Sequence, residues 1–95
     1  MPRVVFTHAV RDVDLWASKH SDRVQAFSAW GSNVVDHVNA DGSKSVGVSV
    51  DVHDMAGMQA GMQTAEMDAA KEAHGVLEPV VVFIEKFSCL PNPKP

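Results

Sequence analysis

The sequence predicts an α+β fold, in which a four-stranded antiparallel sheet carries its helices on one face. The prediction rests on the element order β-α-β-β-α-β, on an Asp-Gly turn between two β-rich segments, and on a length of 95 residues, which suits one domain. This order is that of a ferredoxin-like split βαβ sandwich, whose right-handed crossovers place both helical segments on the same side of the sheet. We expect the domain to span residues 1–88, followed by a proline-rich tail over residues 89–95.

The first strand is expected over residues 3–10, which are mostly β-branched or aromatic. Alternate side chains share a face of a strand, so one face carries Val4, Phe6, His8 and Val10. A single long helix is expected next, over residues 14–30, because apolar side chains recur there at steps of three and four. An aspartate precedes it as a possible N-cap, and Gly31 follows as the expected stop.

A β-hairpin is expected over residues 33–53, with Asp41-Gly42 in its turn, because glycine tolerates the positive φ that such turns need. Its second arm has the cleanest alternation in the chain. One face carries Val46, Val48, Val50 and Val52, and the other carries Gly47, Ser49, Asp51 and His53. The apolar face is expected in the core, and the polar face against solvent, a water-filled space or another subunit.

Two short helices and a last strand complete the predicted domain. Asp54 and Thr64 are the expected N-caps, and a break near residues 63–64 separates the helices because Gly57 and Gly61 disfavour one long helix. Pro79 then introduces an apolar strand over residues 80–87. Since the helices cover only one face of the sheet, a chain this short is expected to form a homodimer through the other face.

Composition excludes several classes of partner. Eight Lys and Arg stand against 12 Asp and Glu, a formal net charge of −4, which argues against a nucleic-acid or anionic-membrane surface. The first residues contain no apolar segment typical of a signal peptide or a membrane span. A single cysteine, Cys89, suits a reducing compartment, so we expect a cytoplasmic protein. No usual metal-binding spacing is present, and we expect neither a metal nor a cofactor.

Residues 8–16, HAVRDVDLW, resemble the H-x-V-x-D-x-D-x-W opening of small proteins of the dimeric α+β barrel superfamily, which includes antibiotic-biosynthesis monooxygenase and small cyclase-like domains. The segments VSVDVHDMAGM and MDAAKEAHGVLEPVVVFIE are similar to that superfamily's third strand and closing elements, so the resemblance covers residues 4–85. It implies a homodimer whose two sheets face each other as a barrel, with a ligand cleft between helices and sheet. It also implies cofactor-free oxygenase, cyclase or isomerase chemistry, whereas the absence of Asn from residues 3–10 disfavours haem degradation.

The candidate site residues lie on the faces expected to point toward that cleft. His8 is the candidate catalytic residue, because imidazole titrates near neutral pH and can transfer protons. A core histidine bonded to a carbonyl or carboxylate is the alternative. The candidate ligand-binding residues are Trp16, His20, Arg23 and Phe27 on one helical arc, with Met58 and Met62 as an adaptable wall.

Each of these residues also has a purely structural interpretation. A buried Arg23 needs an anionic partner, which can be Asp36, Asp51 or a ligand carboxylate. The methionines are expected mainly to fill the core. Asp–His pairs between Asp36 or His37 and Asp51 or His53 are expected to tie the hairpin strands together. His74 is interpreted as a helix C-terminal residue favoured by the helix dipole.

Two functional hypotheses therefore remain. The first is an enzyme that binds a small apolar or aromatic metabolite, with His8 transferring a proton and His20 or Arg23 orienting a carboxylate or enolate oxygen. The second is a homodimer that binds a ligand, or acts in stress, without catalysis. An open cleft that reaches His8 and Arg23 would favour the first hypothesis, and a closed, methionine-packed space would oppose it.

Overall fold

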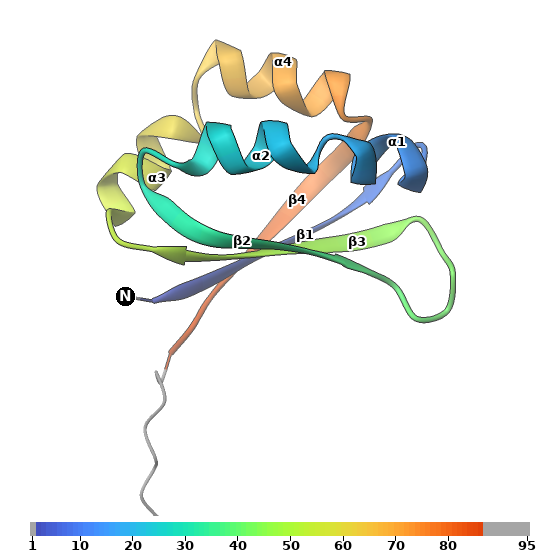
Figure 1. Cartoon of the computed structure of the whole chain (residues 1–95), viewed down its shortest axis with the longest axis horizontal. Helices are drawn as coiled ribbons and strands as arrows, with labels where there is room; N and C mark the ends of the chain where they lie inside the picture. The colour runs from blue at the N-terminus through green and yellow to red at the C-terminus, as the bar shows by residue number, and fades with distance from the viewer. Residues whose placement is uncertain (1, 87–95) are drawn as a thin grey trace, which may run out of the picture.

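A computed structural model describes residues 2–86 and confirms the α+β prediction (Figure 1). In this part of the chain, a four-stranded antiparallel sheet has the order β2-β3-β1-β4. The strands are β1 Arg3–Val10, β2 Gly31–Val38, β3 Ser45–Val52 and β4 Val76–Ile84. The helices are α1 Val13–Ser18, α2 His20–Phe27, α3 Met55–Gly61 and α4 Ala65–Ala73. The predicted tail, including Cys89, lies outside the described residues.

The helices lie together on one side of the sheet, as Figure 1 shows, and the core fills the space between the two layers. The apolar face predicted for β3 is confirmed, because its four valines at even positions are at most 4% exposed, although Gly47 and Ser49 on the other face are also buried. In the register with β1, Phe6 lies opposite Val48 and His8 opposite Val46. His8 therefore belongs to the sheet face that points toward the helices.

The prediction of one helix over residues 14–30 is wrong, because the helix breaks at Lys19. Within a continuous helix, the carbonyl oxygen of Trp16 would accept a hydrogen bond from the N–H of His20. Here the Trp16 oxygen accepts instead from the Lys19 N–H at 3.1 Å and from Arg23 Nη2 at 2.8 Å. The second helix then ends at Phe27. Gly31 is not a helix stop but the first residue of β2, where a Cβ would lie 2.7 Å from Val50 Cγ2.

The last strand begins at Val76, earlier than predicted, and Pro79 lies inside it. Proline has no N–H to donate to a neighbouring strand, but β4 is an edge strand with one unpaired side. The pairing of β4 with β1 shifts register between Thr7 and Ala9. Pro79 can therefore lie inside β4, and it does not mark the start of this strand.

The helices of the second half follow the prediction. Asp54 Oδ1 accepts a hydrogen bond from the Gly57 N–H at 2.9 Å, and Thr64 Oγ1 accepts one from the Met67 N–H at 3.0 Å. Both are the N-cap bonds expected of these residues. The break between α3 and α4 falls at residues 62–64, as the two glycines indicated.

Gly57 and Gly61 also allow α3 to pack closely on Trp30, which is 3% exposed. A Cβ at Gly57 would lie 3.3 Å from Trp30 Cβ, and one at Gly61 would lie 2.9 Å from Trp30 Nε1. The two glycines are one helical turn apart and face the same side. The close contact of helix and indole therefore explains glycines that a helix otherwise disfavours.

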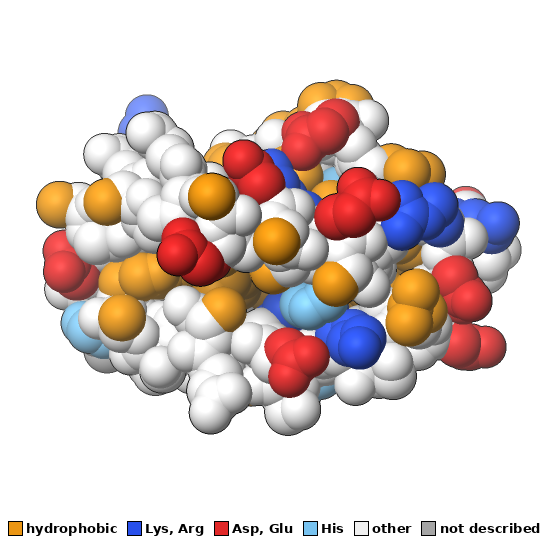
Figure 2. Space-filling view, turned by 90° about the horizontal axis from the view of Figure 1, so that it is seen from above, with side chains coloured by type: hydrophobic (Ala, Val, Ile, Leu, Met, Phe, Trp, Pro, Cys, Tyr) orange, Lys and Arg blue, Asp and Glu red, His pale blue; other side chains and the backbone are white. Residues whose placement is uncertain are grey.

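The helical side of the molecule carries acidic side chains that are spread over the helices and lie among basic and apolar ones (Figure 2). This face therefore presents no continuous basic surface. Among residues 2–86, no helix is both long and apolar enough to cross a membrane.

Replacing Gly61 with alanine is expected to destabilise the fold by about 1–2 kcal/mol, because the new methyl group overlaps the rigid Trp30 ring and more than offsets the gain in helix propensity. Urea denaturation measures the change. Gln59→Ala on the exposed side of the same helix is the control and should leave stability within about 0.5 kcal/mol. Equal effects of the two substitutions would contradict the packing argument.

Candidate functional site

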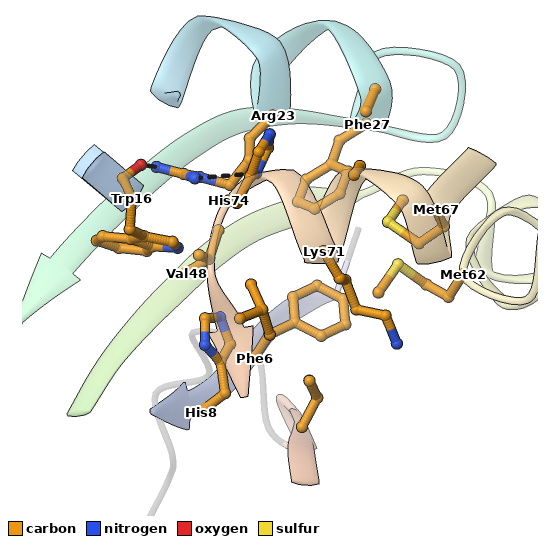
Figure 3. A pocket seen from close by; sticks show the side chains of 14 residues that line it. Phe6, His8, Trp16, Arg23, Phe27, Val48, Met62, Met67, Lys71 and His74 are labelled. Carbon is orange, nitrogen blue, oxygen red and sulfur yellow. Dashed lines mark hydrogen bonds between the residues drawn. The ribbon is translucent and has the colours of Figure 1, made fainter. Parts of the chain in front are cut away.

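A cleft of about 510 Å³, including its open mouth, lies between the sheet and the helices (Figure 3). Its floor consists of sheet residues from β1, β3 and β4: Phe6, His8, Val48, Val76 and Val80. Its roof includes Trp16, Arg23 and Phe27 from α1 and α2, with Met67, Lys71 and His74 from α4 and its C-cap. The space inside it that a water-sized molecule can enter is about 50 Å³, and most of the lining is apolar, as in small-molecule sites.

Five of the predicted site residues line this cleft. They are His8, Trp16, Arg23, Phe27 and Met62. Met58 lies outside it, contrary to expectation, because its side chain is in the core and 4% exposed. His20 is also outside the lining. Because the helix breaks at Lys19, His20 is the first residue of α2, and its half-exposed ring lies beside Asp36.

Arg23 forms the most extensive polar network of the site. Its Nε donates to Asp36 Oδ1 at 3.2 Å, and its Nη2 donates to Asp36 Oδ2 and to the carbonyl oxygen of Trp16. Its Nη1 lies 3.4 Å from His74 Nδ1, and its guanidinium carbon lies 4.3 Å from the centre of the Trp16 ring. The residue is only 5% exposed, so these contacts replace the water that the charge has lost.

These contacts decide between the partners considered for Arg23. A guanidinium has five N–H donors, and the bonds to Asp36, Trp16 and His74 use four of them. Asp36 on β2 is therefore the anionic partner, and a ligand carboxylate is not needed to balance the charge. Nδ1 of His20 also lies 3.1 Å from Asp36 Oδ2, although it is not aligned for a hydrogen bond.

His8 is partly buried on the floor of the cleft. Its Nδ1 lies 3.1 Å from the carbonyl oxygen of Ala9, and its ring meets Trp16 edge-on, with ring centres 6.2 Å apart. Burial, the largest cause, lowers the pKa of His8 below its ordinary value near 6.5, and the Arg23 charge acts in the same direction. His8 is therefore neutral at pH 7.

Lys71 and His74 line the cleft but were not among the predicted site residues. Lys71 Nζ pairs with Glu78 Oε2 at 3.0 Å, which joins α4 to β4 and lowers the pKa of Glu78. His74 is the C-cap of α4, as expected, but it is 7% exposed, and burial together with Arg23 lowers its pKa. It is therefore neutral at pH 7 and cannot act as a charged partner of the helix dipole. Met67, Ala70 and His74 share one helical side in the sequence, a signal that could have identified His74.

The predicted Asp–His pairs of the hairpin do not form. The register places Asp51 opposite Ser32 and His37 opposite Gly47, so the expected partners are not neighbours. His37 Nε2 lies 3.0 Å from Ser49 Oγ, and Asp51 pairs with Arg3 and Asn33. The exposed side chain of His53 lies beyond the end of β3. Among residues 2–86, no group of three or more His, Cys, Asp or Glu side chains is placed to hold a metal ion.

Fold and site together define a small ferredoxin-like α+β protein with a cleft between helices and sheet. The chain is similar in structure to an antibiotic biosynthesis monooxygenase, with a TM-score of 0.66, 10% identity, and coverage of 96% of this chain and 100% of that one. It is also similar to a candidate antibiotic biosynthesis monooxygenase from Bordetella bronchiseptica, with a TM-score of 0.63, 16% identity, and coverage of 90% of this chain and 95% of that one. Rv0793 from Mycobacterium tuberculosis matches with a TM-score of 0.60, 11% identity, and coverage of 97% of this chain and 100% of that one.

No protein-family model matches the chain, and neither does any curated protein. At these identities the structural likeness establishes the fold alone. The fold that the HAVRDVDLW resemblance implied, that of the antibiotic-biosynthesis-monooxygenase-like proteins, is thereby confirmed.

Replacing Asp36 with asparagine is expected to destabilise the protein by about 2–3 kcal/mol, because the Arg23 charge stays buried without its counter-ion. Asp51→Asn is the matched control. Its partner Arg3 has a side chain 51% exposed to water, so the expected loss is below about 1 kcal/mol. Chemical denaturation at pH 7 compares the two variants, and equal losses would show that the Arg23 network does not hold the fold.

Stability is expected to fall as the pH drops from 7.5 to 5.5. Because the folded-state pKa values of His8 and His74 are lowered, the unfolded chain binds more protons between those values and 6.5, and acid therefore favours unfolding. His8→Gln and His74→Gln should each reduce this pH dependence, measured by denaturation across the pH series. His53→Gln, which removes an exposed imidazole, is the control. Unchanged pH dependence in both test variants would contradict the assignment.

Proposed function

We propose that the cleft binds a small, largely apolar molecule and that His8 accepts a proton from it. The observation that carries the proposal is a neutral, partly buried imidazole on the floor of an apolar cleft. Low polarity around the imidazole strengthens a hydrogen bond that it accepts from a ligand, and the methionines can adapt to ligand shape. The ring of Phe27 in the lining suits an aromatic ligand.

The tautomer of His8 follows from its one hydrogen bond. A carbonyl oxygen can only accept, so Nδ1 carries the hydrogen that is donated to Ala9. Nε2 of the neutral ring is then a lone-pair acceptor, and within residues 2–86 it has no hydrogen-bond partner. This nitrogen is the atom that accepts the proton.

Proton removal gives an anion that can react further by cofactor-free oxygenation, cyclisation or isomerisation. Oxygenation is the chemistry named for the structural neighbour, an antibiotic biosynthesis monooxygenase. In this proposal Arg23 shapes the end of the cleft and does not orient the substrate, because four of its five N–H donors are bound to Asp36, Trp16 and His74.

A second copy of the chain is the proposed partner. The sheet face away from the helices carries apolar side chains that include Val35, Val81 and Phe83, exposed by 38%, 44% and 56%. Large apolar side chains exposed on a sheet face that the helices leave bare are typical of a subunit interface. The alternative function is a homodimer that binds a ligand in the same cleft without turnover, and it differs only in whether His8 performs chemistry. Either form functions in the cytoplasm in this proposal.

His8→Gln is expected to lower turnover at least about 100-fold, because glutamine keeps a polar side chain but cannot accept the proton at this position. Wild-type and variant protein are assayed with 1,4-naphthohydroquinone by oxygen uptake and with a lactone by product formation, while sedimentation gives the oligomeric state. His53→Gln is the control and should retain full activity. Wild-type activity in the His8 variant would refute the catalytic role, and binding without turnover in the wild type would select the non-catalytic alternative.

A further inference from the structure

The end of the cleft beside His8 holds a second polar atom without a partner. Within residues 2–86, Trp16 Nε1 is buried and has no hydrogen-bond acceptor, and the whole residue is 0% exposed. Buried indole N–H groups usually find an acceptor, and a missing one is costly. The backbone oxygen of Trp16, by contrast, is bonded to Lys19 and Arg23.

The charged side chains of the lining already have partners. Arg23 is bonded to Asp36 and His74, and Lys71 is paired with Glu78. His8 has its Nδ1 directed at the Ala9 oxygen, which leaves Nε2 as an acceptor. Trp16 and His8 thus offer one donor and one acceptor at the same end of the cleft (Figure 3).

We infer that Trp16 Nε1 and His8 Nε2 together bind one hydroxyl group of the ligand, a phenol or an enol on an apolar body. The hydroxyl oxygen accepts from the indole N–H, and its hydrogen is donated to the imidazole. The two rings are in contact, with centres 6.2 Å apart at an angle of 77°, so a shift of the His8 ring would let one oxygen lie about 2.8–3.0 Å from each nitrogen. The inference rests on the proposed function and adds Trp16 as the residue that selects the substrate.

The same geometry defines the first chemical step. The O–H bond of the ligand breaks, an N–H bond forms at His8 Nε2, and the negative charge stays on the oxygen. The Trp16 N–H then stabilises that charge, and the imidazolium beside it is the counter-ion. Because the indole is fully covered, a neighbouring side chain must shift before the oxygen reaches Nε1. His8 is in contact with the Trp16 ring and only partly buried, so it is the side chain that can shift.

A pair of probes of nearly equal shape tests the inference. 1-Naphthol carries the hydroxyl group, whereas 1-methylnaphthalene has a methyl group in its place. We expect the wild type to bind 1-naphthol at least about tenfold more tightly, and Trp16→Phe to remove most of this preference because phenylalanine keeps an aromatic ring without the N–H. NMR titration gives both dissociation constants for each protein.

The wild-type protein provides a second measurement that does not depend on the folding of the variant. The indole N–H resonance of Trp16 should shift downfield with 1-naphthol but not with 1-methylnaphthalene. Trp30, whose indole lies outside the cleft lining, is the internal control and should not move.

The possible outcomes separate this inference from the function on which it rests. The inference is supported if the wild type prefers 1-naphthol, if Trp16→Phe loses this preference, and if 1-naphthol shifts the Trp16 indole resonance. Equal binding of both probes and an unmoved Trp16 resonance would overturn the role of Trp16 while leaving an apolar ligand cleft. Binding of neither probe by the wild type would refute the cleft as a small-molecule site, and the inference with it.

Discussion

The buried charge of Arg23 is the constraint on which the rest of the site depends. A guanidinium that is 5% exposed must have its donors satisfied by the fold, and its partners come from three separate parts of the chain: the Trp16 carbonyl, Asp36 and His74. These contacts hold α1, α2, β2 and the end of α4 around one point. They also draw the Trp16 carbonyl out of the helix, so the break at Lys19 and the end wall of the cleft have the same origin.

The same constraint determines which residues are left for chemistry. Arg23 is bound to Asp36, so its charge is balanced within the fold. Burial, together with the nearby Arg23 charge, lowers the pKa values of His8 and His74, and both imidazoles stay neutral. A neutral His8 with its Nδ1 hydrogen directed at Ala9 is a base, and the adjacent indole of Trp16 is a donor. An apolar cleft with one base and one donor suits removal of a proton from a weakly acidic hydroxyl group.

Much of the fold was predictable from the sequence because its signals are local. The alternating valines of β3, the Asp-Gly turn and the caps at Asp54 and Thr64 each depend on neighbouring residues, and the structure has all of them. The helix break at Lys19 was not predictable, because it depends on Arg23 reaching back to Trp16 across the helix. The role of His74 was missed for a similar reason, since its contact with Arg23 joins residues 51 positions apart. Gly31 was misread because its close neighbour, Val50, belongs to another strand.

The central claim is that Arg23 serves the fold and that ligands are bound by His8 and Trp16 instead. The most direct measurement is an NMR titration with 1-naphthoate, a carboxylate, that follows the Arg23 Nε–H resonance. Because that N–H donates to Asp36, the account predicts a resonance that is visible, protected from exchange with water and unmoved by the ligand. A carboxylate that shifts this resonance and binds more tightly than 1-naphthol would show that Arg23 is a ligand-binding residue, and would contradict the account.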